Sequence, residues 1–266
     1  MRGKDCPIAA RVGVGRVNLL NFKVSLLNFE HERGVSTRET LRRRKMTSQE
    51  QYFICWSAGA RRMDELWAEG WRHFGPLFFR YRRWEHGGRR YTVMPLRIDL
   101  GRFTPSRSQR RVLARNRDLR IEVRPTELDR EMERMFENHK RRFSDEVPDS
   151  LNNFLSHRPA NVPCRNETIC VYSGDRLVAA HFLDLGHDAT SAVYAMFDPT
   201  ESRRSLGIHT MLLAIDYTRT QGQRYYYPGY ACHEPSLYDY KKNFAGLEYF
   251  DWRGWLPLRE QATSQT

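Results

Sequence analysis

Hydrophobic and polar residues along residues 168–197 predict three consecutive strands. The runs 168–172, 176–183 and 191–197 are rich in aliphatic and aromatic residues, and short polar turns containing Gly174 and Gly186 separate them. Strands joined by turns this short pair antiparallel. This part of the chain therefore predicts an antiparallel meander.

A helix and a further strand are expected after the meander. Asp198-Pro199 ends the third strand, and from Ser205 onward apolar residues recur at helical spacing until Gln221-Gly222 stops the helix. Residues 224–230, rich in tyrosine, then predict a returning strand.

The preceding residues predict shorter elements. Helices are expected at 60–70, between Pro105 and Asp118, and at 149–155; strands are expected at 77–84, 89–96 and 121–123, the first two paired through the turn Gly87-Gly88. The clearest helix starts at Thr126, with Asp129 in a capping-box-like position. Together these elements predict an α+β fold, with a mixed, mostly antiparallel sheet flanked by helices.

Arginine is concentrated between residues 72 and 124. This belt holds fifteen arginines, no lysine and four acids, whereas residues 125–266 hold sixteen basic and twenty acidic residues. Planar guanidinium groups suit bidentate recognition of phosphate or carboxylate. The belt therefore predicts an anion-binding function, and the net charge of +12 agrees with a polyanionic partner.

Cysteine usage and hydropathy bear on the compartment and on cofactors. The five cysteines form no C-x-x-C pair, and no apolar run approaches the ~18 residues that a membrane-spanning helix needs. We expect a reduced, cytoplasmic protein with no metal, no cofactor and no membrane partner.

Residues 1–45 carry eleven basic and four acidic side chains and show no sustained period. They are expected to be a disordered basic extension, or to precede a true start at Met46. The alternatives are a nucleic-acid-binding arm or a targeting peptide.

Several sequence motifs carry a family resemblance. They are Phe103-Thr-Pro-Ser-Arg-Ser-Gln-Arg-Arg-Val-Leu-Ala-Arg-Asn116, Phe197-Asp-Pro with Ser205-Leu-Gly207, Tyr225-Tyr-Tyr-Pro-Gly-Tyr230, and Tyr240-Lys241 with Phe244. In this order they resemble the arginyl-tRNA–protein transferase family, including its leucyl-transferring bacterial branch, over about residues 64–256.

The resemblance implies a GNAT-like transferase domain at 103–266, preceded by a small N-terminal subdomain at 46–102. It also implies an aminoacyltransferase that moves arginine, or leucine, from charged tRNA to the N-terminal α-amine of proteins beginning with Asp or Glu. The product is a degradation signal. The chain departs from the family in one respect: residues 80–95 lack the cysteine cluster that members usually carry there.

The arginine-rich stretch supplies the first candidate binding residues. We expect Arg107, Arg110, Arg111 and Arg115, with Gln109, to contact tRNA phosphates or the acidic side chain of the acceptor. The alternative for these arginines is a solvated helix face.

Other candidates lie in the later motifs. Stacking on the terminal adenine is expected of Tyr225, Tyr226, Tyr227 and Tyr230. Gly229 is expected to let the backbone approach the ligand, and Lys241, beside the further binding candidate Tyr240, to bind phosphate. Tyr227 is a candidate proton donor to the leaving ribose oxygen, Asp198 a candidate base, and Ser205 with Gly207 a candidate oxyanion site at the helix start. The structural alternatives are a buried tyrosine, an ordinary turn aspartate and a helix N-cap, respectively.

Two other functions remain open. The first is a coenzyme-A-dependent GNAT N-acetyltransferase, although Arg204-Ser-Leu-Gly-Ile-His209 has a histidine where the pyrophosphate loop needs a small residue. The second is an inactive relative that binds tRNA or acidic termini.

Overall fold

The computed structural model describes residues 50–86, 88–143 and 147–258. The basic extension predicted at 1–45 lies outside these residues. No helix in the described ranges is long and apolar enough to cross a membrane.

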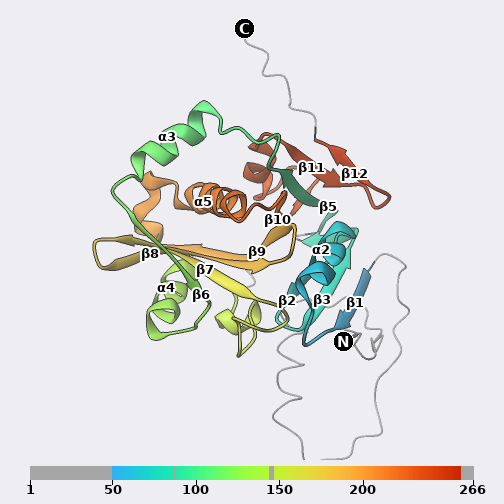
Figure 1. The fold of residues 1–266 in the computed structure, drawn as a ribbon, viewed down its shortest axis with the longest axis horizontal. Helices are drawn as coiled ribbons and strands as arrows, with labels where there is room; N and C mark the ends of the chain where they lie inside the picture. Colours follow the sequence, from blue (N-terminus) through green and yellow to red (C-terminus); the bar gives the residue numbers. More distant parts are fainter. Residues whose placement is uncertain (1–49, 87, 144–146, 259–266) are drawn as a thin grey trace, which may run out of the picture.

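The described residues contain one large nine-stranded sheet with helices on both faces (Figure 1). Its strand order is β12-β11-β5-β10-β9-β8-β7-β6, and β4 pairs with β5 beside this path. The strands are β4 (Arg83–His86), β5 (Arg89–Asp99), β6 (Arg120–Pro125), β7 (Asn166–Ser173), β8 (Arg176–Leu185), β9 (Ala189–Phe197), β10 (Tyr225–Cys232), β11 (Leu247–Phe250) and β12 (Trp255–Pro257). The predicted α+β class, the meander and the returning strand are confirmed.

Period-two alternation along the meander explains why the sheet carries helices on both faces. Ile169 and Val171 of β7 face the cluster that includes α5 (Leu206–Thr220), whereas Cys170 and Tyr172 face the cluster that includes α4 (Arg130–Lys140). Figure 1 shows α5 and α4 on opposite sides of β7 to β9.

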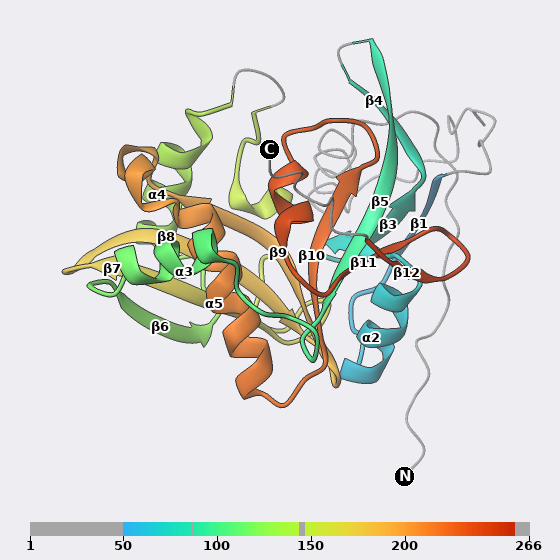
Figure 2. The same ribbon diagram turned by 90° about the horizontal axis from the view of Figure 1, so that it is seen from above.

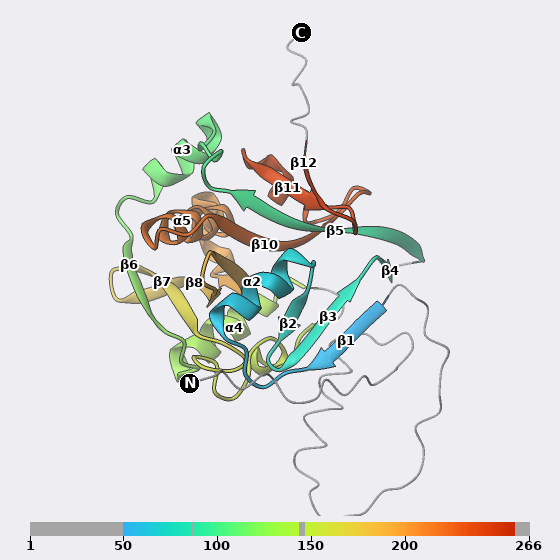
Figure 3. The same cartoon turned by 45° about the vertical axis from the view of Figure 1, so that its right-hand side comes forward.

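Helix α3 (Arg107–Arg115) lies outside α5 and adds a further layer (Figure 3). Val112 and Leu113 of α3 pack against the same cluster as α5. Because α5 is covered by the sheet on one side and by α3 on the other, it is apolar over most of its surface.

A smaller sheet covers one end of the large sheet. It consists of β1 (Glu50–Ile54), β3 (Leu77–Tyr81) and β2 (Arg72–Phe74) in the order β1-β3-β2, and α2 (Ala60–Ala68) lies beside it (Figure 3). The strand expected at 77–84 is in fact two strands in different sheets, because the chain leaves β3 after Tyr81 and only β4 pairs with β5. Figure 2 shows the β4–β5 hairpin extending beyond the sheet.

Strand β5 ties the two parts of the chain together. It lies between β11 and β10 in the large sheet, with Leu96 and Ile98 fully buried, although residues 89–99 fall within the subdomain predicted at 46–102. The register pairs Tyr225 with Asp99 and Cys232 with Val93.

The helix expected from Thr126 begins later, at Arg130. Thr126 continues the pairing of β6 with β7, because its backbone N–H donates to Asn166 and its hydroxyl lies 2.7 Å from that of Thr168. Asp129 is the N-cap and accepts a hydrogen bond from the Met132 N–H.

Candidate functional site

The large sheet separates at one point, between β9 and β10. These two strands are the only parallel neighbours among the described pairs, and they pair only where Tyr225, Tyr226 and Tyr227 meet Ala189 to Ser191. Beyond this point β10 pairs with β5 alone, after a register shift between Tyr226 and Gly229. We call the region where β9 and β10 diverge the splay.

Arg72 of β2 lies at the start of the splay. Its guanidinium donates hydrogen bonds to the hydroxyl of Ser191 and to the carbonyl oxygen of Ala192, the first residue of β9 after the parallel pairing ends. The guanidinium thereby satisfies a carbonyl that strand separation would leave without a partner. Burial lowers the pKa of Arg72.

Lys241 approaches the splay from the other side. It lies in η3 (Asp239–Asn243), and its Nζ donates a 3.2 Å hydrogen bond to the carbonyl oxygen of Tyr230 on β10. Burial, and to a smaller extent the positive charge of Arg72, lowers the pKa of Lys241 to about 7.

Gly229 lies between these two cations. Its φ is +97°, a left-handed conformation that favours glycine, and a Cβ added there would lie 3.4 Å from Lys241 Nζ and 3.8 Å from Arg72 Nη2. Both cations therefore lie within contact distance of the same point beside the β10 backbone.

Neutral aromatic side chains surround the cations. Tyr226 is fully buried, and the Tyr230 hydroxyl donates a 2.7 Å hydrogen bond to the carbonyl of Gly70 and packs edge-on against Tyr81 at 5.4 Å. Burial raises the pKa of all three phenols. Tyr240 is 41 % exposed, and burial raises its pKa to about 12.

Neither Arg72 nor Lys241 forms an ion pair with any described carboxylate. Asp184 favours the charged form of Arg72 electrostatically, but one of its oxygens lies 2.6 Å from His73 Nε2 and the other accepts a hydrogen bond from Asn166. Two largely buried cations that form no ion pair with a described carboxylate can receive a negatively charged ligand.

The sequence-predicted residues fall into three groups. Gly229, Tyr230, Tyr240 and Lys241 come together at the splay. Tyr225 and Tyr227 lie on β10 but belong with a different cluster, where Arg97 covers the Tyr225 ring at 4.1 Å and Tyr227 packs against Trp67 and Trp255. Tyr227 is buried, as the structural alternative for this residue expected, and so is Tyr226.

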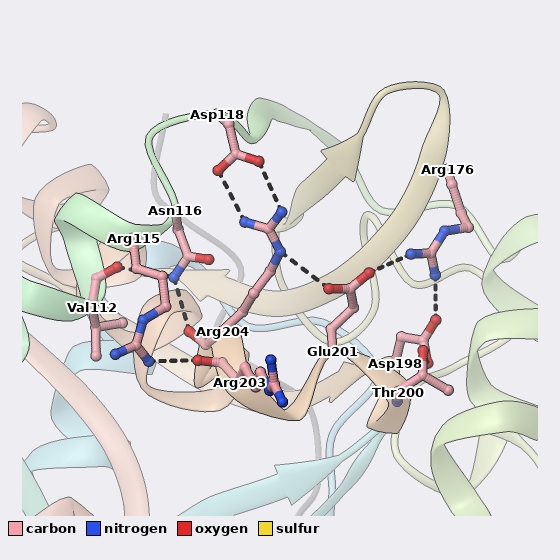
Figure 4. Close-up of polar contacts among 10 residues, drawn as sticks. All are labelled: Val112, Arg115, Asn116, Asp118, Arg176, Asp198, Thr200, Glu201, Arg203 and Arg204. Atoms are coloured by element: carbon pink, nitrogen blue, oxygen red, sulfur yellow. Dashed lines mark hydrogen bonds and ion pairs between the residues drawn. The ribbon is translucent and has the colours of Figure 1, made fainter.

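Asp198, Ser205 and Gly207 form a second group at the far end of β9, roughly 20 Å along the strand from Ser191. The Asp198 carboxylate is buried and accepts hydrogen bonds from Thr200 and Arg176 (Figure 4). It also accepts a 3.0 Å hydrogen bond from the Asn138 side-chain amide. Burial alone would raise the pKa of Asp198, but these hydrogen bonds outweigh it and hold the pKa below its usual range. Its position is that of a cap on the 3₁₀ helix η2 (Pro199–Arg204).

The residues that follow Asp198 are also engaged in local structure. Ser205 has a left-handed φ of 54°, and its side chain makes no capping hydrogen bond to α5, so the N-cap bond considered from the sequence is absent. A Cβ at Gly207 would lie 3.3 Å from the Phe197 ring, so Gly207 allows α5 to pack closely on the end of β9.

The third group lies on α3. Ser106 and Gln109 form a reciprocal capping box, and the buried Gln109 also donates a 3.1 Å hydrogen bond to the carbonyl of Asn243 at the end of η3. The side chains of Arg107, Arg110, Arg111 and Arg115 are exposed. Arg115 and Asn116 donate to the carbonyls of Arg203 and Arg204, which fixes η2 against α3 (Figure 4).

Arg72 was missed by the sequence analysis as a site residue. It is one of fifteen arginines in its belt, and its contact with Ser191 spans 119 residues, so no local pattern distinguishes it. Its position becomes evident only when β2 is placed against β9.

Two groups of described residues could hold a metal ion. His73, Cys164 and Asp184 are buried, whereas Asp64, His187 and Asp188 are more exposed, and the ligand atoms within each group lie within 4.8 Å of one another. His73 Nδ1 already contacts the Gly75 carbonyl, and the Asp64 carboxylate accepts from the backbone N–H groups of His187 and Asp188. Both groups are held by hydrogen bonds within the chain.

Comparison with known proteins identifies the class of enzyme. Residues 130–251 match the family model of the arginine-tRNA-protein transferase C terminus. The chain is 32% identical over 166 residues to an aspartate/glutamate leucyltransferase of Saccharophagus degradans, over 61% of this chain and 70% of the relative. It is 31% identical over 194 residues to that of Acinetobacter baumannii, over 70% of this chain and 68% of the relative.

The chain therefore belongs to the aminoacyl-tRNA–protein transferase family and is an aminoacyltransferase. Among solved structures, the L-PGS of Bacillus licheniformis is similar with a TM-score of 0.39 and 14% identity, over 55% of this chain and 50% of that one. This TM-score is low, and no assignment rests on it.

Proposed function

We propose that the chain transfers an amino acid from its tRNA to the α-amine of proteins that begin with Asp or Glu, and that leucine is the preferred amino acid. The relatives named aspartate/glutamate leucyltransferase support this donor and these acceptors. The observation that carries the proposal is the splay, where Gly229, Tyr230 and Lys241 meet Arg72 at the only parallel pair of the described sheet.

The chemistry needs positioning more than a strong base. The tRNA ester is already activated, and an α-amine has a pKa of ~7.7–8.0, so a useful fraction of it is unprotonated near neutral pH. Holding the ester and the amine together and stabilising the tetrahedral oxyanion then supply most of the rate. Neither step calls for the Asp198 carboxylate, whose acceptor sites are already used.

The tRNA is proposed to lie along α3. Arg107 and Arg111 are exposed and form no ion pair with any carboxylate in the described part of the chain, so their guanidinium groups are available to phosphates. Gln109 links α3 to the end of η3, which carries Tyr240 and Lys241. A tRNA bound on α3 can thus extend its aminoacyl end toward the splay.

Charged tRNA as donor places the proposed reaction in the cytoplasm, and the product is proposed to mark its acceptor for degradation. The donor is tested by offering labelled leucyl-tRNA and arginyl-tRNA side by side to a peptide that begins with Asp. We expect transfer from leucyl-tRNA. Transfer from arginyl-tRNA alone would reverse the choice of donor, and transfer from neither by folded protein would contradict the proposed function.

The role of α3 is tested by Arg111→Ala, with Arg130→Ala as a matched control. Both arginines are exposed, but Arg130 is on α4, across the sheet. Each phosphate contact contributes about 0.7–0.9 to the slope of log affinity against log salt. We expect Arg111→Ala to weaken tRNA binding and to lower this slope by about 1, and Arg130→Ala to change neither.

A further inference from the structure

The two cations at the splay carry more charge than their contacts within the chain require. Arg72 uses two of its five N–H groups on Ser191 and Ala192, and Lys241 uses one of three on Tyr230. All three acceptors are neutral oxygens. An uncharged amide could satisfy such acceptors without the cost of burying a charge, so the charges point to a missing anion.

We propose that Arg72 and Lys241 together bind the side-chain carboxylate of the acceptor protein's first residue. This inference rests on the proposed function and assigns its specificity to two residues. Lys241 Nζ and Arg72 Nη2 lie 3.4 Å and 3.8 Å from the position of a Cβ added at Gly229, so both cations approach one point where Gly229 has no side chain. A carboxylate placed near that point accepts charge-assisted hydrogen bonds from both sides.

The surroundings favour a carboxylate over a tRNA phosphate. Tyr226, Tyr230 and Tyr81 lie close to Arg72. Tyr226 is fully buried and the other two are partly buried, so the site has little access to water. The carboxylate of Asp or Glu is joined to the backbone through one or two methylene groups, so it can enter the site without the rest of the peptide. A tRNA phosphate carries ribose on both sides and fits the exposed arginines of α3 better.

The competing explanation is that the cations only satisfy backbone carbonyls where β9 and β10 diverge. Under that explanation a neutral side chain at position 241 would affect stability but not the choice between Asp and Asn. The two explanations therefore differ in selectivity, which can be measured by binding alone.

The test compares fluorescently labelled peptides that begin with Asp or Asn and are otherwise identical, without tRNA. The variant is Lys241→Met, which keeps the length of the side chain, and the control is Lys242→Met. Lys242 is the next residue of η3 and pairs with Asp239 at 2.8 Å instead of facing the splay. Thermal unfolding of each variant reports whether it is folded.

We expect the wild-type chain to bind the Asp peptide more tightly than the Asn peptide. Lys241→Met should reduce this preference by about 10- to 100-fold, the range for one charge-assisted hydrogen bond, and leave the affinity for the Asn peptide unchanged. Lys242→Met should keep the wild-type preference. Lys241→Glu should abolish Asp binding, because the new carboxylate neutralises Arg72 internally.

Equal binding of the two peptides by the wild-type chain would overturn the inference. So would a Lys241→Met variant that loses affinity for both peptides equally, or one that loses affinity for leucyl-tRNA instead. Because the readout is binding, a chain that prefers Asp but transfers nothing contradicts only the proposed function. A chain that transfers leucine to the Asp peptide in preference to the Asn peptide, and keeps this preference in the Lys241→Met variant, contradicts only this inference.

Discussion

At the scale of single residues, Gly229 leaves the point close to both Arg72 and Lys241 free of a side chain. Gly229→Ala should cost about 1 kcal/mol of stability because of its positive φ, and should reduce binding of the Asp peptide much more than this strain explains. Gly222→Ala is the matched control, since Gly222 has a φ of +72° and nothing within 4 Å of an added Cβ. Equal effects of the two substitutions on peptide binding would show that the space beside Gly229 is not used.

Lys241 gives acceptor binding a defined pH dependence. Its pKa of about 7 means that the ammonium is present below neutral pH and is lost as the pH rises from about 6 to 8. The other titratable groups that face it keep their state over this range: the pKa of His181 is lowered to about 3 by burial, the pKa of the Cys232 thiol is raised, and Arg72 stays charged.

Affinity for the Asp peptide should therefore fall as the pH rises through 7, whereas Lys241→Met should show little change over the same range. The measurement is a peptide-binding titration between pH 6 and 8. An affinity that rises with pH in the wild-type chain would contradict a protonated Lys241 as the ligand of the carboxylate.

Residue types alone could predict only part of the candidate site. Gly229, Tyr230 and Lys241 stand in sequence motifs that resemble a known family, and the structure brings them together. Asp198 is equally prominent in sequence, yet it caps η2. Its hydrogen bonds to Asn138 and Arg176 come from segments far away in the chain, and no local pattern announces them.

At the scale of elements, Gln109 couples α3 to η3 and thereby positions the segment that carries Lys241. Gln109→Ala removes half of the capping box and leaves the Asn243 carbonyl without this donor. We expect a loss of about 1–3 kcal/mol in unfolding free energy, together with weaker binding of the Asp peptide.

Arg107→Ala, on the exposed side of the same helix, serves as the control and should leave stability within about 0.5 kcal/mol of wild type. Chemical denaturation of the three proteins measures this difference. A Gln109→Ala variant as stable as Arg107→Ala would show that the link between α3 and η3 contributes nothing.

Elements with a strong hydrophobic periodicity could be predicted from the sequence. Elements that form only by pairing with segments distant in the chain could not. The strands of the meander and α5 follow from apolar spacing over many residues. The short strands β2, β11 and β12 hold three or four residues each and exist because other strands lie beside them: β3 beside β2, β5 beside β11, and β11 beside β12. The chain likewise breaks between β3 and β4 because β3 pairs with β1 and β4 pairs with β5.

At the scale of the whole molecule, the arginine belt of 72–124 proves to be several structures. Arg72 is at the splay, the arginines of α3 are exposed outside α5, and others pair with acids, as Arg97 does with Glu248 at 2.7 Å and Arg124 with Asp129 at 2.8 Å. The anion-binding function that the sequence indicated stays a prediction. Only the folded structure distinguishes the largely buried cations Arg72 and Lys241 from the exposed arginine surface of α3.

Arginines of the belt thus lie both on α3 and at the splay. The central claim is that the chain binds a polyanionic donor on α3, outside α5, and an acidic acceptor at the splay. The most direct test incubates the folded chain with leucyl-tRNA and an equimolar mixture of two peptides that begin with Asp and with Asn, followed by mass spectrometry of both. The structure predicts one leucine on the α-amine of the Asp peptide and little or none on the Asn peptide. Leucine added equally to both peptides, or to neither, would contradict it.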